Sequence, residues 1–299
     1  MSRETSARTG KSYGLERVCR VLEFSRSTIY AQEKRQAGKV LPFQPARRGP
    51  RPKVADADLL EAIRADLSAS PFTGEGHRKV RARLRILKDI RVGRSRVLRL
   101  MREHQLLSPH RRPQGTPRLH DGTITTDRPN EMWGTDGIRI ETVNEGWVWV
   151  FSAVDHFDAC CVGIHAVKIG NRFAALQPIA QGLLAEFGAT GADAGRGLAL
   201  RMDNGTQYTA DDFLNQVKFW GIAPSFAFVA EPQTNGVAER FNRTLKEQAI
   251  HGRVFRNVEE VRAAVTEFKE RYNRHWRLEK LGFMSPLEAR QAYAMRKAA

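Results

Sequence analysis

The spacing of hydrophobic residues along the chain changes from a helical period in its first third to strand-like runs in the middle. Near the N-terminus, apolar residues recur every three or four positions from Leu15 to Leu22, which predicts a short helix. Ser25 follows and is suited to cap a second helix from Arg26 to Lys34. The first 37 residues are therefore expected to form a pair of short helices.

Two interpretations of this helix pair are open. A turn followed by a helix that carries Arg26, Ser27, Thr28 and Tyr30 has the form of a DNA-reading helix-turn-helix. A helical hairpin that only packs on the rest of the protein fits equally well, because short helix pairs are common.

Three further helices are predicted at Asp56–Leu67, about 76–87 and about 93–104. The last two direct many basic residues outward, which suits a helix-turn-helix domain with the third helix as reader, or simply a solvated face. The residues expected to face inward are Leu59, Leu60, Ile63, Leu67, Val80, Leu84, Leu87, Val97, Leu100 and Met101. Those expected to face outward are His77, Arg78, Lys79, Arg81, Arg83, Arg85, Arg94, Ser95, Arg96 and Arg99.

From residue 131 the pattern becomes that of an α/β domain. Apolar, β-branched and aromatic runs broken by turn residues predict a three-stranded meander at 132–141, 147–155 and 160–168. The elements predicted after it are a helix at 171–187, a strand at 197–202, a helix at 211–220, a strand at 223–228, and helices at 235–250 and 258–272.

Two stretches rich in proline and arginine, 38–53 and 111–130, separate these regions. Proline fixes φ and removes a hydrogen-bond donor, so both are expected to be basic linkers, extended along DNA or simply solvated. The predicted organisation is 1–37 as a helix-turn-helix-like segment, 38–53 as a linker, 54–110 as a DNA-binding domain, 111–130 as a second linker, 131–290 as the catalytic core with C-terminal helices, and 291–299 as a tail.

The net charge of +16 is unevenly distributed. Residues 1–130 carry +16, residues 131–239 carry −7 and residues 240–299 carry +7. Basic flanks around an acidic segment suit binding of a phosphate backbone followed by metal-dependent chemistry on it. Nucleic acid is therefore the expected partner.

The sequence gives no indication of a membrane protein or of a disulfide framework. The hydrophobic content of 41% is ordinary, no apolar run is long enough to cross a bilayer, and the stretch Met1–Thr5 is polar. Three cysteines, of which Cys160 and Cys161 are adjacent, make neither a disulfide framework nor a zinc site. A reducing, cytoplasmic and nucleoid-associated location is expected.

Three acidic residues stand in distinctive settings. Asp136 ends the stretch Trp133–Asp136, Asp203 is followed by Asn-Gly, and Glu239 lies within Asn235–Asn242, with 35 residues between Asp203 and Glu239. Three convergent carboxylates can bind hard divalent cations, and two such ions can hold the attacking and leaving oxygens of a phosphodiester in line. Taken singly, each Asp is equally a turn or cap residue, and Asp-Asn-Gly is good turn chemistry. The joint pattern favours a metal site.

Two neighbouring features bear on this site. Glu239, Arg243 and Lys246 share one helical face, which allows either a simple ion pair or a metal ligand beside two cations that grip DNA. Asp155 ends a predicted strand and could be mistaken for a metal ligand, but we interpret it as a turn residue and His156 as structural.

These motifs resemble the DDE core of retroviral integrases and, most closely, the second-frame (OrfB-type) transposases of the IS3 family. The resemblance covers nearly the whole chain and extends through Tyr13–Cys19, Ser25–Tyr30, Val97–His104, Tyr272–Arg274 and Ser285–Ala289. A basic residue seven positions after the Glu is a further mark of the family, and Lys246 stands there.

The resemblance implies an α/β fold, namely a ribonuclease H-like integrase catalytic core with a five-stranded mixed sheet and flanking helices, preceded by small all-α helix-turn-helix modules. It implies that Asp136, Asp203 and Glu239 form the catalytic triad and bind Mg²⁺ or Mn²⁺, with two ions per active site. The implied reaction is cleavage and strand transfer of DNA by direct phosphoryl transfer, through a copy-out and paste-in route.

The resemblance also implies partners, which are double-stranded DNA at the element ends and the target, further copies of the chain on that DNA, and an upstream-frame (OrfA-type) protein. The residues expected to contact DNA are Lys246, Arg243, Arg240, Asn235, Arg26, Ser27, Thr28, Arg94, Arg96, Arg99, Arg78 and Lys79.

Two other functions fit parts of the pattern. One is a catalytically silent regulator that binds element ends, against which the intact triad argues. The other is a metal-dependent nuclease without strand transfer, over which Lys246 and the basic N-terminal modules favour a transposase.

Overall fold

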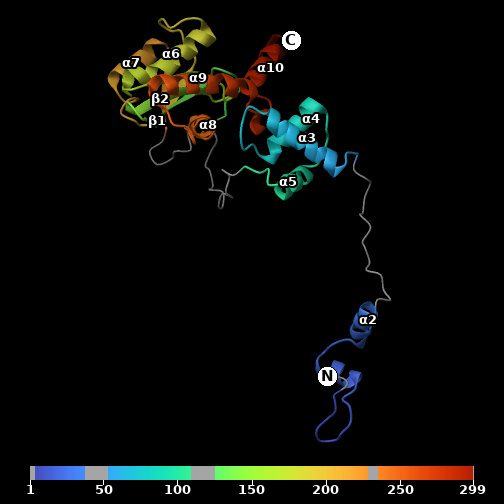
Figure 1. Ribbon diagram of the computed structural model, residues 1–299. Helices are drawn as coiled ribbons and strands as arrows, with labels where there is room; N and C mark the ends of the chain where they lie inside the picture. Colours follow the sequence, from blue (N-terminus) through green and yellow to red (C-terminus); the bar gives the residue numbers. More distant parts are fainter. Residues whose placement is uncertain (1–3, 38–52, 109–124, 228–234, 299) are drawn as a thin grey trace. The chain divides into compact units, whose positions relative to one another are not determined.

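The computed structural model describes residues 4–37, 53–108, 125–227 and 235–298 (Figure 1). Its internal contacts divide the chain into two compact units, Met1–Lys53 and Val54–Ala299. The predicted linkers fall largely outside the described residues, at 38–52 and 111–124.

The first unit is a pair of short helices, α1 (Leu15–Val21) and α2 (Arg26–Gln36), as the hydrophobic spacing predicts. Among its described residues, Cys19 alone is buried, so the pair has almost no core of its own. Ser25 is the N-cap residue of α2, as expected, although its side chain does not accept a capping hydrogen bond and its hydroxyl lies 2.6 Å from that of Ser27.

The second unit begins with three helices, α3 (Asp56–Ala69), α4 (His77–Lys88) and α5 (Arg94–Glu103), which we call the helical module. All three are close to their predicted bounds. They pack around a small core formed by Leu59, Ile63, Val80, Leu84, Val97, Leu100 and Met101. Leu87 was predicted to face this core but is 61% exposed, because it lies in the last turn of α4 beyond the packed face.

Arg83 is a second correction within the helical module. The sequence placed it on the basic outer face of α4, yet it is only 7% exposed. Its guanidinium donates to Asp66 Oδ2 at 2.8 Å and also to Glu75. A buried charge is tolerated when opposite charges surround it and satisfy its donors, and these two carboxylates do so.

A five-stranded mixed sheet forms the centre of the second unit. Its order is β3-β2-β1-β4-β5, in which β1, β2 and β3 are an antiparallel meander while β4 and β5 run parallel to β1. This is the predicted α/β arrangement of a ribonuclease H-like core. The strands are β1 (Met132–Thr142), β2 (Gly146–Asp155), β3 (Cys161–Val167), β4 (Ala199–Met202) and β5 (Ala223–Phe226).

Helices cover both faces of the sheet because its strands alternate between two apolar faces. One face packs against α6 (Arg172–Phe187) and α7 (Asp211–Phe219), with Trp133 fully buried between them and the strands. The other packs against α8 (Gly236–Leu245) and α9 (Val258–His275). Two hydrophobic layers therefore hold the sheet rigid.

The C-terminal part departs in detail from the sequence expectation. The single helix predicted at 235–250 consists of α8 followed by a wider π-helical turn at Lys246–Ile250. A 3-10 turn at Glu279–Leu281 and a final helix α10 (Pro286–Ala298) follow α9. Within the described residues, no helix is both long and apolar enough to span a membrane.

Arg290 of α10 fastens this last helix to the sheet. It is paired with Asp155 at 2.9 Å, with Asp158 at 2.7 Å and with Glu186 of α6. Asp155 also accepts hydrogen bonds from the backbone of Asn130 and Phe157. Asp155 thus has a structural role, as the sequence suggested.

Gly163 offers a test of the packing between β3 and α6. A Cβ at this position would lie 1.9 Å from the carbonyl oxygen of Pro178, inside α6. We expect Gly163→Ala to lower the free energy of unfolding by about 2 kcal/mol or more, because neither backbone can move freely. Urea denaturation measures this. Gly191→Ala, whose new methyl meets no atom within 4 Å, is the control, and equal midpoints for the two variants would contradict the packing.

Candidate active site

Asp136 lies in the middle of β1, and its half-buried carboxylate has two donors. The amide Nδ2 of Asn242 donates to its Oδ2 at 2.8 Å, and the backbone N–H of Gly137 lies 2.7 Å from its Oδ1. Burial raises the pKa of Asp136 above its ordinary value and repulsion from Asp203 adds to this, whereas the two donors and the charge of Lys246 lower it.

Asp203 follows β4 directly, so the strand order brings it to Asp136. The parallel pairing ends with Gly134 opposite Arg201, and Asp203, just beyond it, is close enough to Asp136 to raise its pKa. The Asp203 carboxylate is exposed and accepts the backbone N–H of Gly205 at 2.9 Å. The turn role that Asp-Asn-Gly suggests is therefore present together with the electrostatic contact to Asp136.

Glu239 lies in the first turn of α8, where the helix dipole favours a negative charge. Its side chain is exposed. Partial burial nevertheless raises its pKa, and repulsion from Asp136 raises it further, while Arg243 one turn later lowers it. The third carboxylate therefore interacts electrostatically with the first.

Asp136 is the residue that links the three carboxylates, through one repulsive interaction with Asp203 and another with Glu239. Across the ranges that the structure describes, no group of three or more His, Cys, Asp or Glu side chains lies close enough together to hold a metal ion. The donor set itself suits a hard divalent cation, because all its ligands are carboxylate oxygens whose repulsion a cation would offset.

Asn242 is a site residue that the sequence reasoning missed. Its Nδ2 donates to Asp136, and its Oδ1 accepts the hydroxyl of Ser152, on β2, at 3.2 Å. It therefore joins α8 to two strands. The available signal was its position three residues after Glu239, on the same helical face.

Asn235 and Tyr208 also lie next to Asp136, and the sequence did not predict this position for either residue. Asn235 was expected to contact DNA, but it is buried and donates from Nδ2 to the backbone oxygen of Thr135 at 3.0 Å. Tyr208 is buried, which raises the pKa of its hydroxyl, and nearby Asp136 and Asp203 raise it further. Both side chains thus pack around the carboxylates from inside the protein.

Arg243 and Lys246 were expected on the same helical face as Glu239, and Arg243 is close enough to lower the pKa of Glu239. Arg240, Arg243 and Lys246 are all exposed, and the charge of Lys246 is close enough to lower the pKa of Asp136. Lys246 is also the first residue of the π-helical turn. The C-terminal half of α8 therefore presents positive charge next to the carboxylates.

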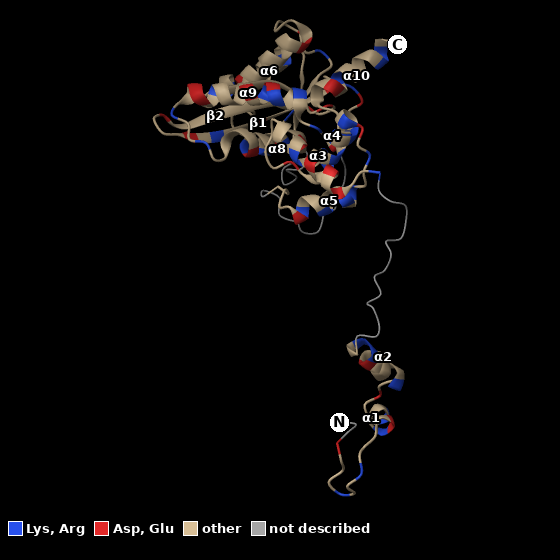
Figure 2. Cartoon of the chain, turned by 45° about the vertical axis from the view of Figure 1, so that its right-hand side comes forward, with Lys and Arg blue, Asp and Glu red and all other residues tan. Residues whose placement is uncertain are grey.

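Several residues of the helical module that were expected to contact DNA have partners within the protein. Arg78 pairs with Glu279 at 2.7 Å, and the ammonium of Lys79 lies 2.8 Å from the ring centre of Trp276. Arg96 and Arg99 both bind Asp56. Arg94, at the start of α5, is exposed (Figure 2 shows the distribution of charge).

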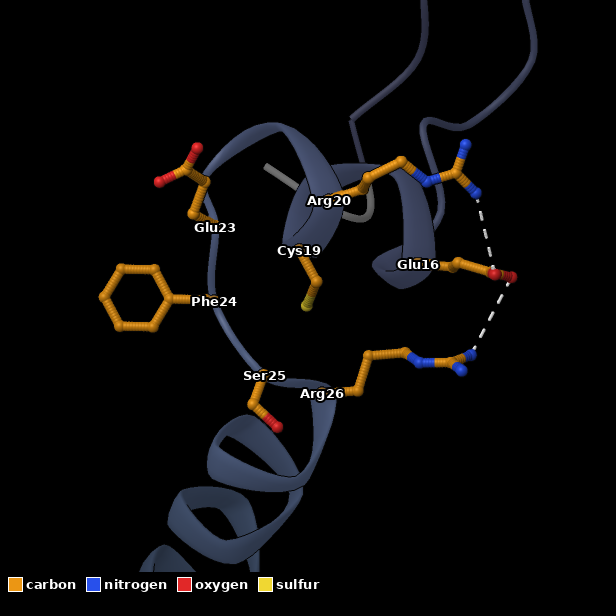
Figure 3. A pocket seen from close by; sticks show the side chains of 7 residues that line it. All are labelled: Glu16, Cys19, Arg20, Glu23, Phe24, Ser25 and Arg26. Carbon is orange, nitrogen blue, oxygen red and sulfur yellow. Dashed lines mark ion pairs between the residues drawn. The ribbon is translucent and has the colours of Figure 1, made fainter.

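In the first unit, the expected DNA-contacting residues form the start of α2. Figure 3 shows Glu16 between Arg20 and Arg26, each at 3.7 Å. The hydroxyl of Ser27 is hydrogen-bonded to the hydroxyl of Ser25, and the backbone N–H of Thr28 donates to the backbone oxygen of Ser25. These contacts are exposed, so they leave the side chains accessible.

His156 is structural, as expected. It is buried next to Gly134, and burial together with the charges of Lys280 and Arg201 lowers its pKa to about 4. A neutral imidazole at physiological pH adds no further positive charge to the neighbourhood of Asp136.

The fold and the arrangement of the carboxylates are those of an integrase core that follows a helix-turn-helix-like domain in the chain. Residues 126–232 and 220–286 each match an integrase core domain family, and residues 55–114 match an HTH-like domain family. The helical module and the sheet domain thus correspond to two known kinds of domain.

Relatives extend this match to nearly the full length. The chain is 26% identical to the transposase for insertion sequence element IS629 of Shigella sonnei, over 95% of this chain and 93% of that protein. It is also 26% identical to the transposase InsD for insertion element IS2A/D/F/H/I/K of Escherichia coli, over 93% and 91%. Among solved structures, the catalytic core domain of BIV integrase is 23% identical over 57% of this chain and 99% of that chain, with a TM-score of 0.40. The chain thus contains regions that match integrase core and HTH-like domain families, and along nearly its full length it is similar to transposases of insertion sequences.

The Asn242–Asp136 bond leads to a prediction about protonation. Removing the amide in Asn242→Ala takes a donor from the carboxylate form, so the pKa of Asp136 should rise above its already elevated value. Carboxyl ¹³C chemical shifts followed through a pH titration measure this directly. Asn257→Ala, which removes an amide whose oxygen caps α9 instead, is the control. A lowered or unchanged Asp136 pKa would show that Asn242 does not support the charged form.

Proposed function

We propose that this protein is a DNA transposase that cleaves the ends of an insertion sequence and joins them to new DNA by direct phosphoryl transfer. The observation that carries the proposal is that Asp136, on the central strand β1, lies close enough to Asp203 and to Glu239 for each pair of carboxylates to repel one another. Its near full-length relatives, which are transposases, support the same class of reaction.

Asp136, Asp203 and Glu239 would hold Mg²⁺ or Mn²⁺, with two ions per site. A bound divalent ion supplies charge neutralisation and orientation of the phosphodiester oxygens. Glu239 stands in the first turn of α8 and is the residue whose approach would complete the ligand set, once a cation offsets its repulsion from Asp136.

The chain's own residues would position the reacting groups. Asn242 and the Gly137 N–H fix the orientation of the Asp136 carboxylate. Arg243 and Lys246 are placed to hold DNA phosphates beside the carboxylates. Water or a DNA 3′-hydroxyl attacks phosphorus and the 3′-oxygen of the cleaved strand leaves, so no bond to the protein forms.

We propose that the helical module and the first unit hold the element end while the core performs the chemistry. Arg94 at the start of α5 and Arg26 to Thr28 at the start of α2 are the proposed contacts, together with Arg240 on α8. Copies of the chain acting together on two ends, and an upstream-frame protein, are proposed as further partners. The proposed domain bounds remain 1–37, 54–110 and 131–290, with linkers between them and a tail at 291–299.

The triad yields the first test of this function. Asp136→Asn and Glu239→Gln should each lower Mg²⁺-dependent cleavage and joining by about 1,000-fold or more, because the charge stabilisation in the transition state is lost. Binding to the same duplexes should remain. Gel analysis of labelled duplexes that carry the ends of the encoding DNA element measures both. Glu247→Gln, which removes a carboxylate from the adjoining π-helical turn, should leave the rates within about twofold.

The same assay distinguishes the other two functions. Joined product from the wild-type chain supports a transposase. Cleavage without joining would make it a nuclease. Binding without chemistry, even after addition of the upstream-frame protein, would make it a regulator and overturn the proposal.

Lys246 generates a second prediction. If it contacts a phosphate, Lys246→Ala should weaken DNA binding to a similar extent for all sequences and lower the salt slope of log K by about 1. Fluorescence anisotropy at several salt concentrations measures the slope. Lys218→Ala removes an exposed lysine from α7 and should leave the slope unchanged. Equal slopes for the Lys246 variant and the wild type would remove Lys246 from the DNA interface.

A further inference from the structure

The turn between α3 and α4 inserts an aromatic side chain into the catalytic core. Phe72 is 3% exposed and belongs to the hydrophobic cluster formed by the sheet, α8 and α9. Its ring meets that of Trp276 edge-on, with centroids 4.8 Å apart. The guanidinium of Arg271 lies 5.5 Å from the centre of the Phe72 ring. The residue is therefore part of the core, although it is contributed by the helical module.

The next residue makes a paired polar contact with the core. The backbone N–H of Thr73 donates to Oε1 of Gln248 at 3.0 Å, and Nε2 of Gln248 donates to the backbone oxygen of Thr73 at 2.9 Å. The backbone N–H and the backbone oxygen of Thr73 are thus both hydrogen-bonded to the side chain of Gln248. Gln248 lies two residues after Lys246, in the same π-helical turn.

The inserted turn is itself held from within the module. Glu75, 3% exposed, accepts the hydroxyl of Ser70 at 2.6 Å and is paired with Arg83. Arg83 is paired in turn with Asp66 of α3. The turn is therefore fixed to both α3 and α4, which share one core with α5.

We propose that this contact, made by Phe72, Thr73 and Gln248, fixes the helical module on the catalytic core and determines which phosphodiester is cut relative to the sequence that the module holds. The inference rests on the proposed function, because it requires DNA contact by the module and cleavage by the core. The helices α3, α4 and α5 share one core, the ion pairs of Arg83 link α3 and α4 to the turn, and the turn is hydrogen-bonded to Gln248 beside Lys246.

A loosened contact would have a defined effect. The module would still bind DNA, because its own core does not include Phe72. The core would no longer meet the DNA at one fixed distance. Since a displacement of about 1 Å at the reacting groups costs about 100-fold in rate, product at the original position should fall while cuts at neighbouring positions appear.

The experiment compares the full-length wild type with Phe72→Ala, Phe72→Leu and Phe219→Ala. The probe is a duplex that carries one end of the DNA element encoding the chain. Cut positions are mapped at nucleotide resolution with Mg²⁺, and hydroxyl-radical footprints are recorded with Ca²⁺ in its place. Phe219 is 53% exposed on α7 and provides the matched removal of an aromatic ring.

For Phe72→Ala we expect the footprint to shorten to the part of the duplex that the module holds. Product at the original position should fall about tenfold or more, and new cuts should appear beside it. Phe72→Leu should restore most of both properties, and Phe219→Ala should match the wild type. A Phe72→Ala variant with the wild-type footprint and a single wild-type cut position overturns the inference.

The footprint separates this inference from the proposed function. If the wild type makes no cut, the proposed chemistry fails, and the footprints still decide the inference. A long wild-type footprint that shortens in Phe72→Ala supports a fixed module, whereas equal footprints overturn it. Circular dichroism melting of the variant confirms that a shortened footprint comes from a folded protein.

Discussion

Burial of the Asp136 carboxylate on the central strand of the sheet, beside two further carboxylates, is the constraint on which the rest of the site depends. Burial raises the pKa of Asp136 and repulsion from Asp203 adds to this, while Asp136 in turn raises the pKa of Glu239. Such an arrangement is unfavourable unless other groups offset it. The neighbouring donors and cations matter because they stabilise the charged form of Asp136.

The support comes from rigid elements rather than from surface loops. Asn242 reaches Asp136 from α8, and Ser152 on β2 in turn orients the Asn242 amide. Asn235 ties the start of α8 to Thr135, directly before Asp136. The same helix therefore brings Glu239 toward Asp136 and supplies the amide donor that favours the charged form of Asp136. A cation bound there would meet carboxylates already oriented by packed neighbours, which is what preorganised charge stabilisation requires.

The sequence predicted the elements well because their signals are local. The meander, the two parallel strands and the helices of the module follow from periodicity, and the positions of Asp136 and Asp203 follow from strand order. Its errors concern contacts that hydrophobic periodicity does not reveal. Arg83 was read as an exposed cation because nothing in α4 indicates that Asp66 and Glu75 surround it. Asn242 was passed over because its partners, Asp136 and Ser152, lie about 100 residues away. The π-helical turn at Lys246 continues a helical pattern that periodicity does not distinguish from an α-helix.

These long-range contacts also change the meaning of the positive charge. From its sequence the helical module would have a broad basic surface. In the structure, Arg78 and Lys79 contact the core, and Arg83 and Arg96 form ion pairs with α3. Arg94 and Arg102 of α5 are exposed, and in the proposed function they are available to a phosphate backbone. Two cations of α4, Arg78 and Lys79, thus serve to attach the module to the core, whereas Arg96 and Arg99 of α5 are bound to Asp56. In the proposed function, a module attached to the core suits site-selective cutting better than a module on a flexible linker. Only a fixed distance between the bound sequence and the carboxylates determines which phosphodiester is cut.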